Sequence, residues 1–352
     1  MINHLIFIIL IFLGYFVLKS SLPYQHKNTR LFINYVCIVL IFQSALRHIE
    51  VGVDTYTYFR EFEKVKSISW SEIIANFKNV YVDSEGKDAG YLLLEKCFQV
   101  FCESFRVFLF FVAWLFFTAY AKLLKRYLKN NREVLISSLL YLLLFYSFFS
   151  ITGIRQTIAV ALSIHAFLAL SDKSWLKYSV LAILAFFIHK SAIILLLFPL
   201  FLFTASAKKI VMISICLFPL SIIFRSDLVA VFRGLADYDV YEVGLPIKLM
   251  LLFFTLSIWI FYNVYKKRFP SESYDLVKIF AITFSWIPLL GWDSLFMREI
   301  LYFSIYFLLL IPICIRVLPL RERNLLYIVT ITATLILFLV SSEDYRFYWQ
   351  GI

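Results

Sequence analysis

The sequence predicts an all-α, polytopic integral membrane protein with about twelve transmembrane helices. Of its 352 residues, 62% are hydrophobic and only 16% are charged, and the mean hydropathy is +0.84, far from the usage of soluble proteins. Apolar runs that approach the ~30 Å thickness of a hydrocarbon layer recur along the whole chain. The alternating pattern of strands is absent, and helices satisfy their own backbone groups in lipid.

Each apolar run is bounded by charged or turn residues, and in chain order we expect helices over 4–18, 31–46, 104–121, 134–151, 154–170, 174–188, 191–206, 210–224, 247–264, 277–291, 299–315 and 324–340. The first run has no preceding basic residue and no small-residue cleavage site after it, so we expect it to be retained. Segment 89–103 is apolar but interrupted by Glu95 and Lys96, which favours the membrane interface. No tandem repeat or inverted pair of broken spans is evident, so residues 1–352 are expected to form one integral domain.

Basic residues mark one face of this arrangement. The loops expected on that face contain Lys19, Lys27, Arg30, Lys122, Lys125, Arg126, Lys129, Arg132, Lys173, Lys177, Lys208, Lys209, Lys266, Lys267, Arg268, Lys278, Arg316, Arg321 and Arg323. By the positive-inside rule this face is the cytoplasm, and both termini then lie outside. The net charge of +11 is therefore topological and does not indicate nucleic-acid binding. The long loops 47–103 and 225–246 fall outside, which favours work on the outer face.

Polar residues from four separate regions converge on the same outer face. They are Arg47, His48 and Asp54 after the second helix, Arg155 and Gln156 at the start of the fifth, His189 between the sixth and seventh, and Asp293, Arg298 and Glu299 at the start of the eleventh. Charges at the edges of membrane spans are costly unless they face a cavity or one another. These residues are therefore candidates for function.

Two of these residues carry the most specific chemistry. Arg155 follows Gly153 at a helix N-terminus, where free amide groups and the helix dipole already favour an anion. A guanidinium adds two parallel hydrogen bonds to phosphate oxygens, so we expect a phosphate or pyrophosphate site. His189 lies at the outer surface, where a general base would be useful, although an interhelical hydrogen bond is the alternative. His165, deep in an apolar helix, is expected only to pack.

The stretch "RHIEVGVDTYTYF" at 47–59 combines a turn with sugar-binding side chains. Gly52 permits a tight turn, Asp54 supplies a carboxylate, and Tyr56 and Tyr58 supply aromatic faces. An interfacial aromatic belt is the alternative interpretation of the two tyrosines.

Metal and cofactor sites are not expected. The "DYD" motif at 237–239 is too short a match to predict a metal site. The five cysteines have no zinc-ligand spacing, and Cys97 and Cys102, five residues apart on a helix, point to different faces. We therefore expect no metal, no cofactor and no disulfide.

Four blocks carry a family resemblance: "RHIEVGVDTYTYF", "ITGIRQTIA", "FFIHKSA" and "MREILYF". In order and spacing over roughly residues 40–315 they resemble the Arg-x-x-x-x-Gly-x-Asp-Thr, Gly-x-Arg-Gln, Phe-x-His-x-Ser and Arg-x-x-x-Tyr-Phe blocks of the EpsG-like branch of Wzy-type O-antigen and exopolysaccharide polymerases. One departure concerns "DAGY", where Ala89 displaces Asp88 from the acidic position that the family usually has before Gly-Tyr. This departure puts a role for Asp88 in doubt.

The resemblance implies a GT-C-like, inverting glycosyltransferase of the bacterial cytoplasmic membrane with its active site facing the periplasm. Such an enzyme moves a glycan from undecaprenyl pyrophosphate to the non-reducing end of a lipid-linked repeat unit. Arg47, Arg155 and Arg298 would then stabilise the pyrophosphate, and His189 or, second, Asp54 would be the base. Gln156, Tyr56, Tyr58, Asp293 and Glu299 would contact substrate. A chain-length regulator and a flippase are the candidate protein partners, beside membrane lipid.

Two other classes remain open on sequence grounds. An O-antigen ligase, or another lipid-linked glycosyltransferase, would share the histidine and arginine chemistry. A flippase for lipid-linked oligosaccharides would also need about twelve helices and cations for pyrophosphate, but its charges should line a cavity at mid-membrane depth. Here the charges cluster at one face.

Overall fold

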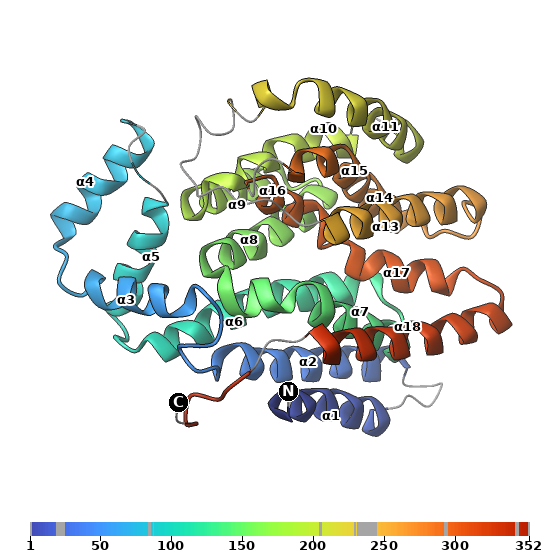
Figure 1. The fold of residues 1–352 in the computed structure, drawn as a ribbon, viewed down its shortest axis with the longest axis horizontal. Coiled ribbons are helices and arrows are strands. Elements are labelled where there is room, and N and C mark those ends of the chain that lie inside the picture. The colour runs from blue at the N-terminus through green and yellow to red at the C-terminus, as the bar shows by residue number, and fades with distance from the viewer. Residues whose placement is uncertain are drawn as a thin grey trace.

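The all-helical prediction is confirmed in a computed structural model of the chain (Figure 1). The structure describes residues 2–18, 25–83, 86, 88–203, 206–228, 230, 245–291, 295–341 and 345–350. These residues contain no β-sheet, and their one isolated bridge is antiparallel, between Arg47 and Phe347.

Most helices fall on the expected apolar runs, whereas the helices at Thr55–Val65 and Trp70–Tyr81 lie within the expected loop 47–103. The first group comprises α1 (Ile2–Val17), α2 (Gln25–Ala45), α3 (Thr55–Val65), α4 (Trp70–Tyr81), α5 (Ala89–Gln99), α6 (Phe105–Tyr127), α7 (Asn131–Leu144), α8 (Ile154–Ser171) and α9 (Trp175–Ile188). The second comprises α10 (Phe198–Phe203), α11 (Ala207–Ile223), α13 (Leu245–Val264), α14 (Tyr274–Ala281), α15 (Thr283–Trp286), α16 (Leu295–Ser304), α17 (Phe307–Arg316) and α18 (Leu320–Ser341). The expected outer loop 225–246 lies mainly outside the described residues.

Several of these helices could cross a membrane. Among the described residues, 5 stretches are long and apolar enough: His26–Ala45, Phe105–Tyr127, Ile154–Ser171, Phe296–Arg316 and Leu320–Val340. Shorter apolar helices cover Asn3–Val17, Trp175–Ile188, Lys190–Phe203 and Thr255–Val264. The membrane class of the protein is supported, whereas the count of about twelve spans stays a prediction.

Four expected spans are not single α-helices. The interruptions are a π-helical turn at Ser147–Thr152 after α7, a 3₁₀ helix η3 at Lys190–Leu197 before α10, a 3₁₀ segment at Ile287–Gly291 after α15, and a break between α16 and α17. Pro288 accounts for one of them, because it has no amide hydrogen for an α-helical bond. The π-helical turn lies just before Arg155, and η3 begins directly after His189. Irregular backbone inside a membrane protein is tolerated where protein or a cavity surrounds it, and it often marks a functional site.

The loops that the sequence assigned to one face do meet at one end of the bundle. Contacts between these loops are Arg126–Asp172 at 2.8 Å, Lys129–Glu272 at 3.0 Å, Arg316–Glu133 at 3.2 Å and the amide of Asn131 to the carbonyl of Leu18 at 2.7 Å. Helices α3, α4 and α5 lie at the opposite end (Figure 1). The grouping of the loops is therefore correct, and their assignment to the cytoplasm stays a prediction.

Both chain ends lie at the end of the bundle that carries α3. The Asn3 side chain donates a hydrogen bond to the carbonyl of Tyr345 at 2.7 Å, and the His48 amide donates to the carbonyl of Arg346 at 2.8 Å. Segment 345–350 thus joins the start of α1 to the residues after α2 (Figure 1). This agrees with the expectation that both termini share a face.

Helix α5 contains the charged residues that interrupt the apolar segment 89–103. Lys96 Nζ donates to the carbonyl of Val65 at 3.1 Å, and the Gln99 amide donates to the carbonyl of Phe62 at 2.7 Å. Both bonds satisfy carbonyls at the C-terminal end of α3, which an isolated helix leaves open. These polar residues therefore fasten α5 to α3.

Helix α5 also meets the C-terminal end of α9 backbone to backbone. A Cβ atom on Gly90 would lie 2.2 Å from the carbonyl oxygen of Phe187, so only glycine permits this approach. The hydroxyl of Tyr81, at the end of α4, donates to the same carbonyl. The contact places the residue before α5 next to the residue after α9.

We expect Gly90→Ala to destabilise the protein by about 1–3 kcal/mol, because the added methyl group overlaps backbone that cannot move independently. The measurement is the midpoint of thermal unfolding in detergent. Gly14→Ala is the matched control, since its Cβ would also lie 2.2 Å from a neighbour, but that neighbour is the ring of Tyr35, a side chain that can shift. Equal losses in the two variants would show that the Phe187 contact is not special.

Candidate active site

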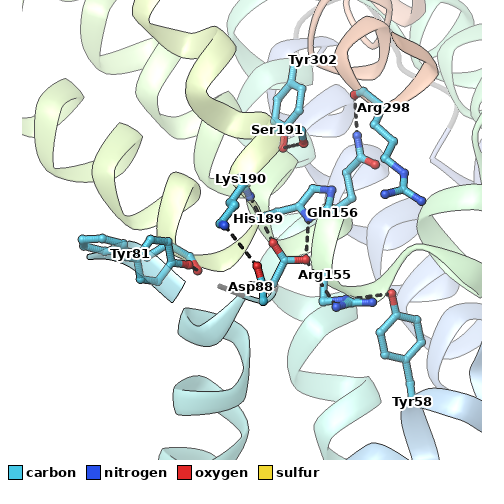
Figure 2. Close-up of polar contacts among 12 residues, drawn as sticks. Tyr58, Tyr81, Asp88, Arg155, Gln156, His189, Lys190, Ser191, Arg298 and Tyr302 are labelled. Atoms are coloured by element: carbon cyan, nitrogen blue, oxygen red, sulfur yellow. Dashed lines mark hydrogen bonds and ion pairs between the residues drawn. The ribbon is translucent and has the colours of Figure 1, made fainter. Parts of the chain in front are cut away.

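His189 stands in the break between α9 and η3. Its backbone is extended (φ −154°, ψ 115°), and its side chain is buried. Its ring nitrogen Nδ1 lies 3.0 Å from Oδ2 of Asp88, which arrives from the loop before α5 (Figure 2). The break therefore presents an imidazole to a carboxylate that is distant in sequence.

Asp88 is the centre of the cluster. It precedes α5 with a left-handed backbone (φ 45°), which Asp tolerates better than most residues, and its side chain makes no capping bond to α5. Instead, Oδ1 accepts the backbone amide of Lys190 at 3.2 Å, while Oδ2 faces His189. Lys190 Nζ donates to the carbonyl of Gly86 at 3.2 Å.

Arg155 is the third member of the cluster. Its Nη1 lies 3.4 Å from Asp88 Oδ2, and its Nε donates to the hydroxyl of Tyr58 at 3.3 Å. The guanidinium carbon is 5.4 Å from the ring centre of Tyr58 and 5.9 Å from that of Tyr91, within cation–π range. The Arg155 side chain is 27% exposed, compared with 1% for Asp88. The arginine is thus held by its neighbours and still open on one side.

The charges around Asp88 determine which ring nitrogen of His189 carries the hydrogen of their contact. Burial opposes the charge of Asp88, but His189 and Arg155 outweigh it and hold the pKa of that carboxyl below its ordinary value. An ionised carboxylate only accepts hydrogen bonds, so the His189 Nδ1 carries the hydrogen of the 3.0 Å contact. When the ring is neutral, the other ring nitrogen, Nε2, has the lone pair that can accept a proton.

A second polar group joins η3, α8 and α16. The Gln156 side-chain amide donates to the carbonyl of Arg298 at 2.5 Å, and the Ser191 and Tyr302 hydroxyls lie 3.1 Å apart (Figure 2). Glu299 is buried, and its Oε2 has no hydrogen-bond partner among the described residues. The four chain regions that the sequence singled out therefore do converge, with Arg298 half-buried at the rim.

Arg47 is also at this end, but its contacts are internal. It is 3% exposed, and its guanidinium donates to the carbonyls of Ser44 and, at 3.1 Å, Ile151, with Nε 3.4 Å from the hydroxyl of Thr55. Gly52 turns with φ 86° against the side chain of Ile151. Through these contacts Arg47 connects α2, α3 and the π-helical turn. Binding of pyrophosphate by Arg47 stays an untested prediction.

The other predicted residues divide between the cluster and the surface. Tyr58 belongs to the cluster, whereas Tyr56 is 48% exposed and its described ring contact is a tilted one with Phe59. Asp54 is exposed at the start of α3 and makes no capping bond. Asp293 lies outside the described residues, as does the "DYD" motif at 237–239.

No group of three or more His, Cys, Asp and Glu side chains in the described part of the chain is placed to hold a metal ion. The five cysteines are free, which agrees with the expectation of no disulfide. The expectation of no metal stays a prediction.

Sequence reasoning left Asp88 in doubt and did not single out Tyr91. The available signal for Asp88 was the acidic residue near Gly-Tyr in "DAGY", which the extra alanine obscured. In the structure that alanine only begins α5, and Asp88 still reaches His189. Tyr91 could have been found from its place one helical turn before the buried Glu95.

An all-helical membrane protein with a histidine, carboxylate and arginine cluster at one end of its bundle fits a membrane enzyme that handles an anionic substrate. The chain belongs to the EpsG family, whose family model matches residues 30–350. This match confirms the resemblance that the four blocks indicated and points to a function of the polysaccharide-polymerase type. No curated protein and no solved structure matches the chain.

The buried Glu95 below Tyr91 predicts how stability depends on pH. Burial raises the pKa of its carboxyl to about 8, well above the ordinary range, while the Tyr91 side chain and Arg155 lower it only in part. A raised carboxyl pKa favours folding at low pH, and that contribution is lost as pH rises through about 8. The free energy of unfolding, and with it the unfolding temperature, should therefore fall between about pH 5 and pH 8, by at most ~1.4 kcal/mol for each unit of the pKa shift.

Glu95→Gln should flatten this pH dependence without changing the unfolding temperature near pH 5. Glu63→Gln, at an exposed carboxylate on α3, is the control and should leave the slope unchanged. A slope that persists in Glu95→Gln would assign it to another group.

Proposed function

We propose that the protein is a polysaccharide polymerase that transfers a glycan from a polyprenyl pyrophosphate, undecaprenyl pyrophosphate in bacteria, to the non-reducing end of a lipid-linked repeat unit. The observation that carries the proposal is the Asp88–His189–Arg155 cluster. A histidine oriented by a carboxylate at 3.0 Å stands beside an arginine that is still partly open. The histidine is suited to accept a proton from an acceptor hydroxyl, and the arginine is suited to bind a diphosphate.

On the donor side, the bond from the anomeric carbon to the pyrophosphate oxygen breaks, and both electrons leave with the pyrophosphate. Arg155 would bind the leaving group, since cations fixed in advance stabilise negative charge as it develops. The N-terminus of α8 adds its dipole at the same place. Arg298 at the rim is the second candidate cation.

On the acceptor side, a sugar hydroxyl attacks the anomeric carbon from the face opposite the leaving group, which inverts the configuration. His189 Nε2 accepts the hydroxyl proton. Asp88 acts as a positioning residue, because its carboxylate fixes the hydrogen on Nδ1 and stabilises the imidazolium that forms.

The remaining predicted residues take supporting roles in this proposal. Tyr58 orients Arg155, and Gln156 and Glu299 shape the wall next to Arg298. Tyr56 and Asp54, which are exposed at the start of α3, would contact the glycan, and Asp54 is the second candidate base. Asp293 stays a candidate substrate contact. Arg47, whose guanidinium donates to the backbone carbonyls of Ser44 and Ile151, would stabilise the π-helical turn before α8.

The site would face the periplasm at the cytoplasmic membrane, because the basic loops gather at the other end of the bundle. A chain-length regulator and a flippase are the protein partners proposed for such a reaction. A flippase function for this chain is disfavoured, since the polar cluster lies at one end of the bundle and a transport path must reach both faces.

The polymer ladder of a deletion strain tests the proposed function against ligation. Loss of every band above a single repeat supports a polymerase. Loss of the single-repeat band as well would contradict it and favour a ligase or a flippase.

Arg155→Lys should fail nearly as badly as Arg155→Ala, because an ammonium keeps the charge but loses the two-pronged geometry. The measurement is the polymer ladder at matched protein levels, and we expect each variant to lose ~10²-fold or more, the cost of removing a preorganised charge-stabilising group. Arg60→Lys, at an exposed arginine on α3, is the control. Near-normal polymer from Arg155→Lys would leave the residue with only an anchoring role.

His189→Ala should lower the rate on the order of 10²–10⁴-fold, the usual effect of removing a general base. Asp88→Asn should cause a smaller loss that appears in kcat more than in KM, because it acts through the histidine. His165→Ala, on the half-buried face of α8, should do little. If His189→Ala kept full-length polymer while Asp54→Asn abolished it, the carboxylate of Asp54 would be the base.

A further inference from the structure

An apolar groove runs between α9 and η3, the two elements that meet at His189. Its volume is ≈ 330 Å³, within the range of small-molecule sites. Its walls include Ala182, Ile183 and Phe186 on α9, and Ala192 and Leu196 on η3. This α9–η3 groove therefore lies on the helices that position the candidate base.

The groove follows from the local structure of the two elements. The 3₁₀ conformation of η3 makes it narrower than an α-helix, and alanines face each other at 182 and 192. The hydroxyl of Tyr178 donates to the carbonyl of Leu195 and ties the two walls together at the end away from His189. This hydrogen bond holds α9 and η3 together at that end of the groove.

The groove is open at the protein surface, and its lining ends one helical turn before His189. Ile183 is 53% exposed and Leu196 is 70% exposed, so the groove is open to lipid along its length. Its upper wall, Phe186, packs against the ring of Tyr81 at 5.8 Å and lies one turn before His189. From Tyr178 to Phe186 the groove extends ~12 Å along the helix axis, at 1.5 Å per residue.

We propose that the α9–η3 groove binds the polyprenyl chain of the lipid-linked substrate whose pyrophosphate lies at Arg155. The inference rests on the proposed function and names the part of the substrate that the polar cluster does not hold. A polyprenyl pyrophosphate joins a multiply charged head to a purely apolar chain. The Asp88–His189–Arg155 cluster and the groove below it offer these two environments in the same order, one at the end of the bundle and the other along its lipid face.

The test compares Ile183→Trp with Leu184→Trp. Both residues are exposed apolar positions on α9, at 53% and 47%, but only Ile183 lines the groove. Each variant is assayed as full-length protein with repeat units on a long polyprenyl pyrophosphate and on a two-isoprene pyrophosphate. Ile183→Trp should raise KM for the long-chain substrate about tenfold, toward the value for the short-chain substrate. Turnover of the short-chain substrate should stay unchanged. Leu184→Trp should change neither.

A second measurement does not depend on turnover. A polyprenyl phosphate with a photoreactive group along its chain should crosslink to α9 and η3, and unlabelled polyprenyl phosphate should compete while phospholipid should not. Competition by phospholipid would mean that ordinary bilayer lipid fills the groove, and equal kinetics in the two tryptophan variants would also overturn the inference. Crosslinking in a protein that forms no polymer would instead reject the proposed reaction and keep the polyprenyl site.

Discussion

The buried carboxylate of Asp88 is the group on which the arrangement of the site depends. A charge removed from water is costly unless it is paired and hydrogen-bonded. Here its oxygens face the imidazole of His189, the backbone amide of Lys190 and the guanidinium of Arg155, which come from the end of α9, the start of η3 and the start of α8. Removing the carboxylate would leave the arginine and the histidine without the charge that orients both. The same carboxylate thus links loop 47–103 to the helix ends that carry His189 and Arg155.

The backbone contact between Gly90 and Phe187 allows this pairing. A carboxylate on a long loop can take many positions, and a hydrogen bond alone does not restrict it to one of them. The close approach of α5 to α9, with the Tyr81 hydroxyl bonded to the same carbonyl, restricts where the residue before α5 can lie. Packing of backbone against backbone therefore sets the distances, and electrostatics sets the protonation.

The apolar runs were sufficient to predict most of the long helices, because in lipid the hydrophobic pattern and the backbone hydrogen bonds favour the same structure. They did not predict α3 and α4, which lie in the expected loop 47–103, or the breaks that divide four expected spans. The convergence of Arg155, Gln156, His189 and Arg298 followed from topology, since each residue lies at a helix end or break on the same side of the bundle. The pairing of Asp88 with His189 did not follow, because it depends on a left-handed residue and a tertiary contact that no periodicity reports. The role expected for Arg47 illustrates the same limit. Its position in the sequence suggests an open cation, whereas tertiary structure surrounds it with carbonyls.

The short antiparallel bridge between Arg47 and Phe347 has a consequence for measuring the sidedness of the site. Together with the bond from Asn3 to Tyr345, it keeps both ends of the chain at the end of the bundle where Asp88 meets His189 (Figure 1). A small epitope on either end would lie on the same side of the membrane as the site and away from its polar groups. Antibody access to intact and to opened cells would then report which compartment the site faces, with every residue of the site left unchanged.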